Sequence, residues 1–114
     1  SYRYKTDDQF WFTFFHEMGH LVLHSERSLF LEDGDEIRTS DEAEANDFAG
    51  RILIPDEWRA SLESADKSHK GVIRLAREIG VSPGIVVGQM QHSGLLPVTW
   101  LNKLKRRLDW PSSP

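Results

Sequence analysis

The sequence predicts a single α+β domain that is mostly helical and carries a small β-sheet. Three observations indicate this class: helix-forming segments that begin at capping signals, two short segments typical of strands, and a length of 114 residues of which 39% are hydrophobic. A chain of this length and composition can bury one modest core. We therefore expect one domain over residues 1–110, with a helical C-terminal part over 70–110 and a frayed tail at 111–114.

The first helix should be the central element of the domain. Thr6 and Gln9 have the spacing of a capping box, which places the start of the helix near Asp7. From residue 10 to residue 23, apolar side chains occupy almost every side of this helix. That pattern predicts a buried helix rather than one that lies on the surface.

Two segments have the pattern of strands. Aromatic and basic residues alternate over 2–5, and the segment 28–38 contains apolar residues followed by a turn signal at Gly34. The expected β-sheet is therefore small and formed near one edge of the domain.

The other helices follow from capping residues, prolines and glycines. The expected segments are 39–54 ahead of Pro55, a short helix that begins at Pro55, 70–80 with a stop at Gly80, Ser82 to about His92, and 98–110. We see no internal repeat and no low-complexity segment.

Composition and charge exclude several classes of protein. The chain has no cysteine, so a metal ion would need nitrogen and oxygen ligands, and a reducing compartment is compatible. A formal net charge of -4 gives no reason to expect binding to nucleic acid. No apolar run approaches the roughly 20 residues that cross a bilayer. We expect a soluble, cytoplasmic protein, and the start at Ser1 suggests a domain of a longer chain.

The stretch FWFTFFHEMGHLVLH, residues 10–24, contains the pattern His-Glu-x-x-His. On a helix, His16 and His20 lie on the same face and can direct ring nitrogens at one ion. Glu17 points to the side, where it can reach a water on that ion without being a ligand. This is the geometry of zinc hydrolases, in which the metal acidifies a water and the glutamate takes its proton.

The plainer interpretation is a helix whose histidines are satisfied by hydrogen bonds. Two features favour the metal. Burying a histidine pair and a glutamate in an apolar helix costs several kcal/mol unless a partner satisfies them. Gly19 also leaves room for another segment or a substrate to approach the helix closely.

Three other histidines have less defined roles. His24 is eight positions after His16, about 12 Å along the helix axis, so the two cannot share an ion. We expect His24 to be a structural residue or one that supports a ligand. His92 is a candidate for stabilising an oxyanion, against the alternative of a polar residue at a helix end. His69 has no assigned role.

The whole pattern resembles the ImmA/IrrE family of zinc metallopeptidases. The resemblance rests on FWFTFFHEMGHLVLH, DEAEANDFAGRILIP, GVSPGIVVGQMQHSGLLP and TWLNKLKRR, and it is closest to members fused behind a helix-turn-helix antitoxin or repressor domain. It implies a compact zincin-like fold of the gluzincin type and one zinc ion. It also implies an intracellular peptidase that cleaves a helix-turn-helix repressor. Carried onto this chain, His16 and His20 match the zinc ligands and Glu17 the catalytic base.

The resemblance implies that the acidic helix after Asp41 supplies the third ligand, and two glutamates compete for this role. Glu42 and Glu44 are two positions apart, so only one of them can face the ion. Asn46 lies four positions after Glu42, which gives a pattern similar to the Glu-x-x-x-Asp helix of gluzincins, where the second residue orients a ligand histidine. We therefore expect Glu42 to be the ligand, with Glu44 as the alternative, and Asn46 to support a ligand histidine.

Two rival functions remain. The segment LAREIGVSPGIVVGQMQ has the order of a helix-turn-helix, but its second helix begins with apolar residues instead of side chains that read bases. The other rival is a non-catalytic regulatory module that keeps zinc for structure. The sequence favours a zinc-dependent endopeptidase domain that acts on a protein, without direct binding to nucleic acid or membrane. The oligomeric state is left open.

Overall fold

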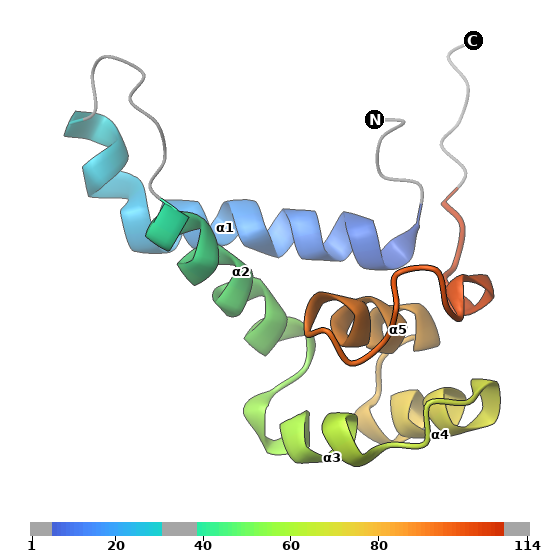
Figure 1. The fold of residues 1–114 in the computed structure, drawn as a ribbon. Coiled ribbons are helices and arrows are strands. Elements are labelled where there is room, and N and C mark those ends of the chain that lie inside the picture. The colour runs from blue at the N-terminus through green and yellow to red at the C-terminus, as the bar shows by residue number, and fades with distance from the viewer. Residues whose placement is uncertain (1–5, 31–38, 109–114) are drawn as a thin grey trace, which may run out of the picture.

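The computed structural model describes the backbone of residues 6–30 and 39–108, and the side chains of these residues except 25–30. Its helices are α1 (Asp7–Phe30), α2 (Thr39–Leu53), α3 (Arg59–Ser64), α4 (His69–Ile79) and α5 (Pro83–His92), with short 3-10 helices η1 (Asp56–Trp58) and η2 (Asn102–Leu104). Figure 1 shows α1 lying across the domain, with α5 directly below it and α3 and α4 in a lower layer.

The described residues contain helices and no strand, so the predicted α+β class with a small sheet is wrong. The one β-type contact among them is an isolated antiparallel bridge between Thr6 and Arg107. Residues 28–30 of the expected strand are the last residues of α1, while 31–38 and the expected strand at 2–5 lie outside the described residues. The helix continues because Leu, Glu and Arg are good helix formers, and neither glycine nor proline interrupts the chain between Gly19 and Gly34.

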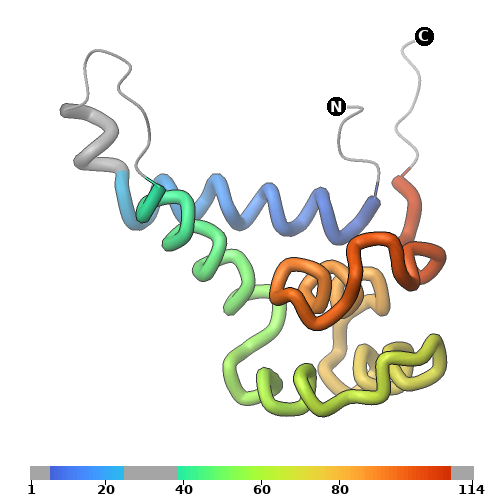
Figure 2. The backbone as a smooth tube through the Cα atoms, viewed as in Figure 1, coloured from blue at the N-terminus to red at the C-terminus, as the bar shows by residue number. Residues whose placement is uncertain are grey.

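The helix α1 packs on one side only. It contacts α2 and α5, and the trace in Figure 2 shows α2 turning back beneath it. Large apolar side chains of α1 remain at least 43% exposed within the described part of the chain: Trp11, Phe14, Leu21, Val22 and Leu23. The expectation of a helix buried on all sides therefore does not hold here.

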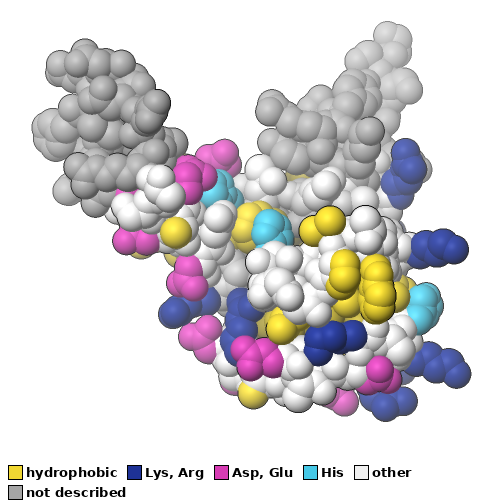
Figure 3. All heavy atoms as spheres, viewed as in Figure 1, with side chains coloured by type: hydrophobic (Ala, Val, Ile, Leu, Met, Phe, Trp, Pro, Cys, Tyr) yellow, Lys and Arg dark blue, Asp and Glu magenta, His cyan; other side chains and the backbone are white. Residues whose placement is uncertain are grey.

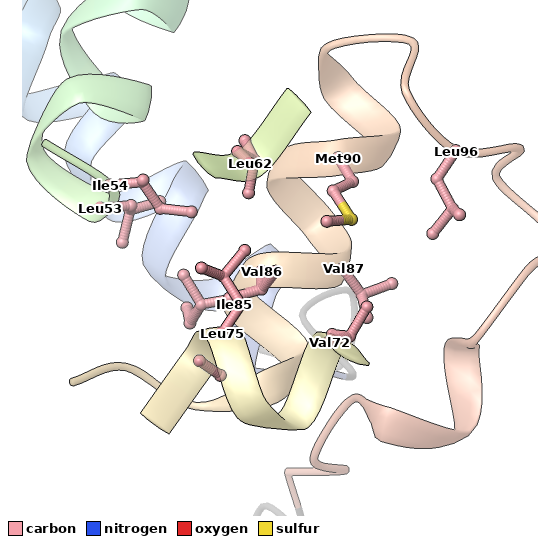
Figure 4. Packing of buried hydrophobic residues seen from close by; sticks show 11 residues of the cluster. Leu53, Ile54, Leu62, Val72, Leu75, Ile85, Val86, Val87, Met90 and Leu96 are labelled. Atoms are coloured by element: carbon pink, nitrogen blue, oxygen red, sulfur yellow. The ribbon is translucent and has the colours of Figure 1, made fainter. Parts of the chain in front are cut away.

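The hydrophobic core lies between α5 and the shorter helices. Figure 4 shows side chains from the end of α2 and from α3 and α4 converging on α5. Every residue of α5 from Gly84 to Met90 is buried, as expected for a helix that is apolar on all sides. This helix is the centre of the fold, and α1 rests on it.

Local signals fix the ends of α4 and α5. The hydroxyl of Ser68 accepts a hydrogen bond from the backbone N–H of Gly71 at 3.1 Å, which caps α4. Gly80 ends α4 with a φ of 92°, in the left-handed region that glycine tolerates best. Pro83 is the first residue of α5, but the hydroxyl of Ser82 donates to the Asp7 carboxylate at 2.8 Å instead of capping that helix.

The start of α1 is fastened to the C-terminal segment by two buried aspartates. The Asp7 carboxylate accepts a hydrogen bond from the backbone N–H of Arg106 at 3.0 Å, and Asp8 forms an ion pair with Lys105 at 3.0 Å. The glycines of α5 make this close approach possible, because a Cβ atom at Gly88 would lie 2.7 Å from the Cβ of Asp8.

The predicted helix over 98–110 is wrong for its described part. Residues 98–108 contain turns and the single short helix η2, and 109–110 lie outside the described residues. Leu101 has a φ of 60°, which breaks any continuous helix. The side-chain amide of Gln91 donates to the carbonyls of Val98 and Trp100 at 3.3 and 3.1 Å, so contacts with α5 fold this segment.

None of the helices in the described ranges is long and apolar enough to span a bilayer.

We predict that Gly88→Ala destabilises the protein although alanine favours helices. The added methyl group would overlap Asp8, so the free energy of unfolding should fall by about 1–2 kcal/mol. Thermal or urea unfolding measures this change. The control is Glu78→Ala on the exposed side of α4, which should change stability by less than about 0.5 kcal/mol. Equal stability of Gly88→Ala and the wild type would show that α1 and α5 are not packed this closely.

Candidate metal centre

One face of α1 carries a column of side chains spaced four residues apart. Phe12, His16, His20 and His24 follow one another along this face, and the three histidines meet acidic side chains of α2. Gly19 lets α2 come close, because a Cβ atom there would lie 3.0 Å from a ring carbon of Phe48 and 3.3 Å from the Cα of Ala45. In Figure 3, histidine side chains reach the surface with acidic side chains near them on the α1–α2 side.

Three ligand residues converge at the seam between α1 and α2. The Nε2 atoms of His16 and His20 are 3.2 Å apart. The carboxylate of Glu42 reaches both, with Oε1 at 3.1 Å from His16 and Oε2 at 2.8 Å from His20. The two histidine side chains are 15–16% exposed and that of Glu42 is 43% exposed, so the group is open on one side.

This donor set fits a zinc ion. Zinc bonds of about 2.0–2.1 Å in a tetrahedral site place neighbouring ligand atoms about 3.3 Å apart, close to the separations found here. Two imidazoles and one carboxylate leave a fourth position open, which distinguishes catalytic from structural zinc sites. The Nδ1 atom of His16 is buried without a hydrogen-bond partner, and Nε2 is the ring nitrogen of His16 that faces Glu42 and His20.

A second group of polar side chains adjoins the first. The Nε2 atom of the buried His24 lies 2.7 Å from Oε1 of Glu44 and 3.6 Å from Oδ1 of Asp41. Its Nδ1 atom lies 3.3 Å from Nδ1 of His20. The alternative ligand Glu44 therefore contacts His24 and not His16 or His20. On the same helix, Arg51 forms an ion pair with Asp47 at 2.9 Å.

The proposed base Glu17 lies on the open side of α1. It is exposed and forms no hydrogen bond or ion pair within the described ranges. It borders an apolar hollow of about 430 Å³ that is lined by α1 residues alone: Phe10, Thr13, Phe14, Glu17, Met18 and Leu21. A carboxylate in this position is free to accept a proton, and an extended apolar side chain can lie beside it.

His92 lies at the end of the aromatic column. Its ring stacks on Phe12 with centroids 4.1 Å apart, and the ring of Phe12 lies 6.1 Å from that of His16. Desolvation lowers the pKa of His92, Asp8 opposes this shift, and Lys105 adds to it. The structure brings His92 towards the site through Phe12, without a hydrogen bond to the three converging residues, and its oxyanion role stays a prediction.

Two further residues complete the comparison with the sequence. Asn46 is exposed and makes no hydrogen bond to Nδ1 of His16, which is unpartnered in this structure. Asp41, by contrast, was not singled out as a site residue, although it is buried and faces His24. Its spacing of three from Glu44 places both on one face of α2, and that spacing is the one signal in the sequence for its role.

The convergence of two histidines and a glutamate makes this seam a candidate metal centre. A family model indicates the class of domain: the chain matches the IrrE N-terminal-like domain, a peptidase family, over residues 2–89. That range covers most of the chain, so the chain belongs to this family. No curated protein matches it, and no solved structure does.

We predict that Glu42→Ala weakens zinc binding far more than Glu44→Ala. Glu42 touches both histidines, whereas Glu44 touches only His24. Loss of a ligand should reduce affinity by more than about 100-fold, and loss of a supporting group by about 10-fold. Competition with a chromophoric chelator gives both affinities. The reverse order of the two glutamates would mean that α2 presents its other carboxylate to the ion.

Proposed function

We propose that this domain is a zinc-dependent endopeptidase. The observation that carries the proposal is the meeting of His16 Nε2, His20 Nε2 and the Glu42 carboxylate within 3.2 Å of one another, on helices that leave one side open. Zinc held there would act as a Lewis acid that acidifies a water molecule and polarises a peptide carbonyl.

The chain's own residues then have separate tasks. The two histidines and Glu42 hold the ion, and Glu17, one position from His16 on the exposed side, accepts the proton of the attacking water. The same carboxylic acid can return this proton to the leaving amine. The apolar hollow beside Glu17 supports binding of a hydrophobic side chain of the substrate.

We propose a helix-turn-helix transcriptional repressor as the substrate. The choice of substrate rests on the resemblance to the ImmA/IrrE family. That resemblance implies a peptidase that cleaves such repressors and thereby allows stress or mobile-element genes to be expressed. A protein substrate agrees with the apolar lining of the hollow on α1, which can take a hydrophobic side chain.

We also propose that this domain does not read DNA. In a helix-turn-helix, α5 would have to enter the major groove. Here its residues from Gly84 to Met90 are buried in the core, and its first turn is apolar. Exposing them would unfold the centre of the domain.

We predict that Glu17→Gln keeps the fold and the zinc affinity but lowers the rate of peptide hydrolysis by about 100-fold or more. The amide retains the size of the side chain and cannot accept the proton. Mass spectrometry of purified helix-turn-helix repressors incubated with the zinc-loaded protein gives the rate, and Glu78→Gln on α4 is the control. Loss of zinc from Glu17→Gln would make this residue a ligand, and full activity would remove it from the mechanism.

For DNA, we predict no tight, sequence-selective complex between this chain and the promoter of its own gene at physiological salt. Fluorescence anisotropy with the promoter duplex and a scrambled duplex tests this. A selective complex with a sub-micromolar dissociation constant would restore the helix-turn-helix interpretation.

A further inference from the structure

A small polar cavity lies where α1, α2 and α5 meet. Its volume is about 220 Å³, and it is lined by Phe12, Asn46, Asp47, Gly50, Arg59, Gln89, His92 and Ser93. On α1, Phe12 is one helical turn before His16, and the two rings lie 6.1 Å apart. On α2, Asn46 is one turn after Glu42. The cavity therefore adjoins the candidate metal centre along the seam between the two helices.

We propose that Arg59 is a specificity-determining residue, which binds the carboxylate of an acidic side chain of the substrate in this cavity. Arg59 is the first residue of α3, and its side chain forms part of the cavity wall. The proposal rests on the zinc-dependent endopeptidase proposed above, and it adds the type of residue that the substrate carries near the cleaved bond.

The guanidinium of Arg59 belongs to a partly buried residue and has no anionic partner within the described ranges. Its one hydrogen bond there goes from Nη2 to Oε1 of Gln89 at 3.5 Å, a long contact with a neutral amide. A guanidinium carries several N–H donors, so most of them remain available to a ligand. Withdrawing this charge from water costs free energy, and a carboxylate offsets that cost best because it accepts two parallel hydrogen bonds.

Two neighbours hold Arg59 in the cavity. A Cβ atom at Gly50 would lie 3.2 Å from Nη2 of Arg59 and 3.1 Å from Oε1 of Gln89, so the glycine leaves room for both groups beside α2. Gln89 is 4% exposed, and its contact draws the guanidinium towards the core. An arginine that only extends into water would need neither a glycine opposite it nor a buried amide.

The charge and size of the cavity select an acidic side chain. Asp47 is the one carboxylate among the described lining residues, and it is paired with Arg51 at 2.9 Å. Asn46, Gln89 and Ser93 add neutral polar groups to the lining. Small-molecule sites usually have volumes of about 300–1,000 Å³, so this smaller cavity suits one side chain of a longer substrate better than a whole metabolite.

Cleavage of a peptide library tests this preference. The zinc-loaded full chain is incubated with short peptides of randomised sequence, and mass spectrometry of the products gives the residues preferred around the cut bond. We expect Asp and Glu to be enriched at one position. Replacing Glu by Gln at that position of a cleaved peptide should lower kcat/KM by about 10-fold or more, mainly through KM, because a charge-assisted hydrogen bond is lost.

The variant Arg59→Gln should cleave the matched Glu and Gln peptides at equal rates, close to the wild-type rate for the Gln peptide. The control is Arg74→Gln, which removes an exposed arginine of α4 and should keep the wild-type preference. Three results would overturn the proposal: no acidic preference in the wild type, the same preference in Arg59→Gln, or an equal fall in kcat for both peptides.

Binding is also measured without hydrolysis. The probe is N-acetylglutamic acid α-amide, whose one carboxylate is on the side chain, and it is titrated into the ¹⁵N-labelled chain without zinc so that it cannot coordinate the ion. The amide signals of Gly50 and Ser93 should shift saturably with this probe, and much less with its glutamine counterpart or in Arg59→Gln. Dispersed spectra show that each protein is folded.

Equal shifts with both probes, or equal shifts in the wild type and Arg59→Gln, would overturn the assignment of a carboxylate to this cavity. A chain that binds zinc but cleaves no peptide would refute the proposed function instead. The titration then still decides whether Arg59 binds a carboxylate, so the two failures are distinguishable.

Discussion

The close packing of α1 against α2 is the constraint on which the site depends. The histidines are on one helix and the carboxylates on the other, so the ligand atoms meet only if the two backbones approach closely. Gly19 permits this, since a side chain there would press on Phe48 and on the backbone of Ala45. A glycine in the middle of a helix costs about 0.5–1 kcal/mol relative to alanine, and here this cost is offset by the contact it allows.

The same seam explains why polar groups are tolerated in an apolar helix. Glu42 bridges two histidines, and a third histidine is paired with Glu44 and Asp41. Every one of these contacts joins α1 to α2, so the acidic helix is held in register by the groups that would hold the ion. Stability and metal binding are therefore coupled, because a bound ion stabilises the folded state in proportion to its affinity and concentration.

Local signals in the sequence were sufficient for part of the fold, and they predict which histidines share a face of α1. Gly80 ends α4 and Pro83 begins α5, and both act through the conformation of the backbone. The spacing of four residues between His16 and His20 places both on one face of a helix, because an α-helix has 3.6 residues per turn. The prediction of a strand over 28–38 is wrong for residues 28–30, which extend α1. A short apolar run that contains good helix formers fits either a strand or a helix. The prediction of a helix over 98–110 is wrong for its described part because hydrogen bonds from the Gln91 side chain stabilise turns there. No local sequence pattern indicates those hydrogen bonds. The role of Asp41 depends likewise on which face of α2 meets His24.

X-ray absorption at the zinc edge, recorded on the full chain loaded with one equivalent of zinc, examines the site at the level of its ligands. The account predicts two imidazole nitrogens and a remainder of oxygen atoms, at about 2.0–2.1 Å from the ion. The imidazole signal should disappear in the double variant His16→Ala, His20→Ala. A spectrum with three imidazoles would place His24 on the metal, and one without any imidazole would show that the seam between α1 and α2 is not a zinc site.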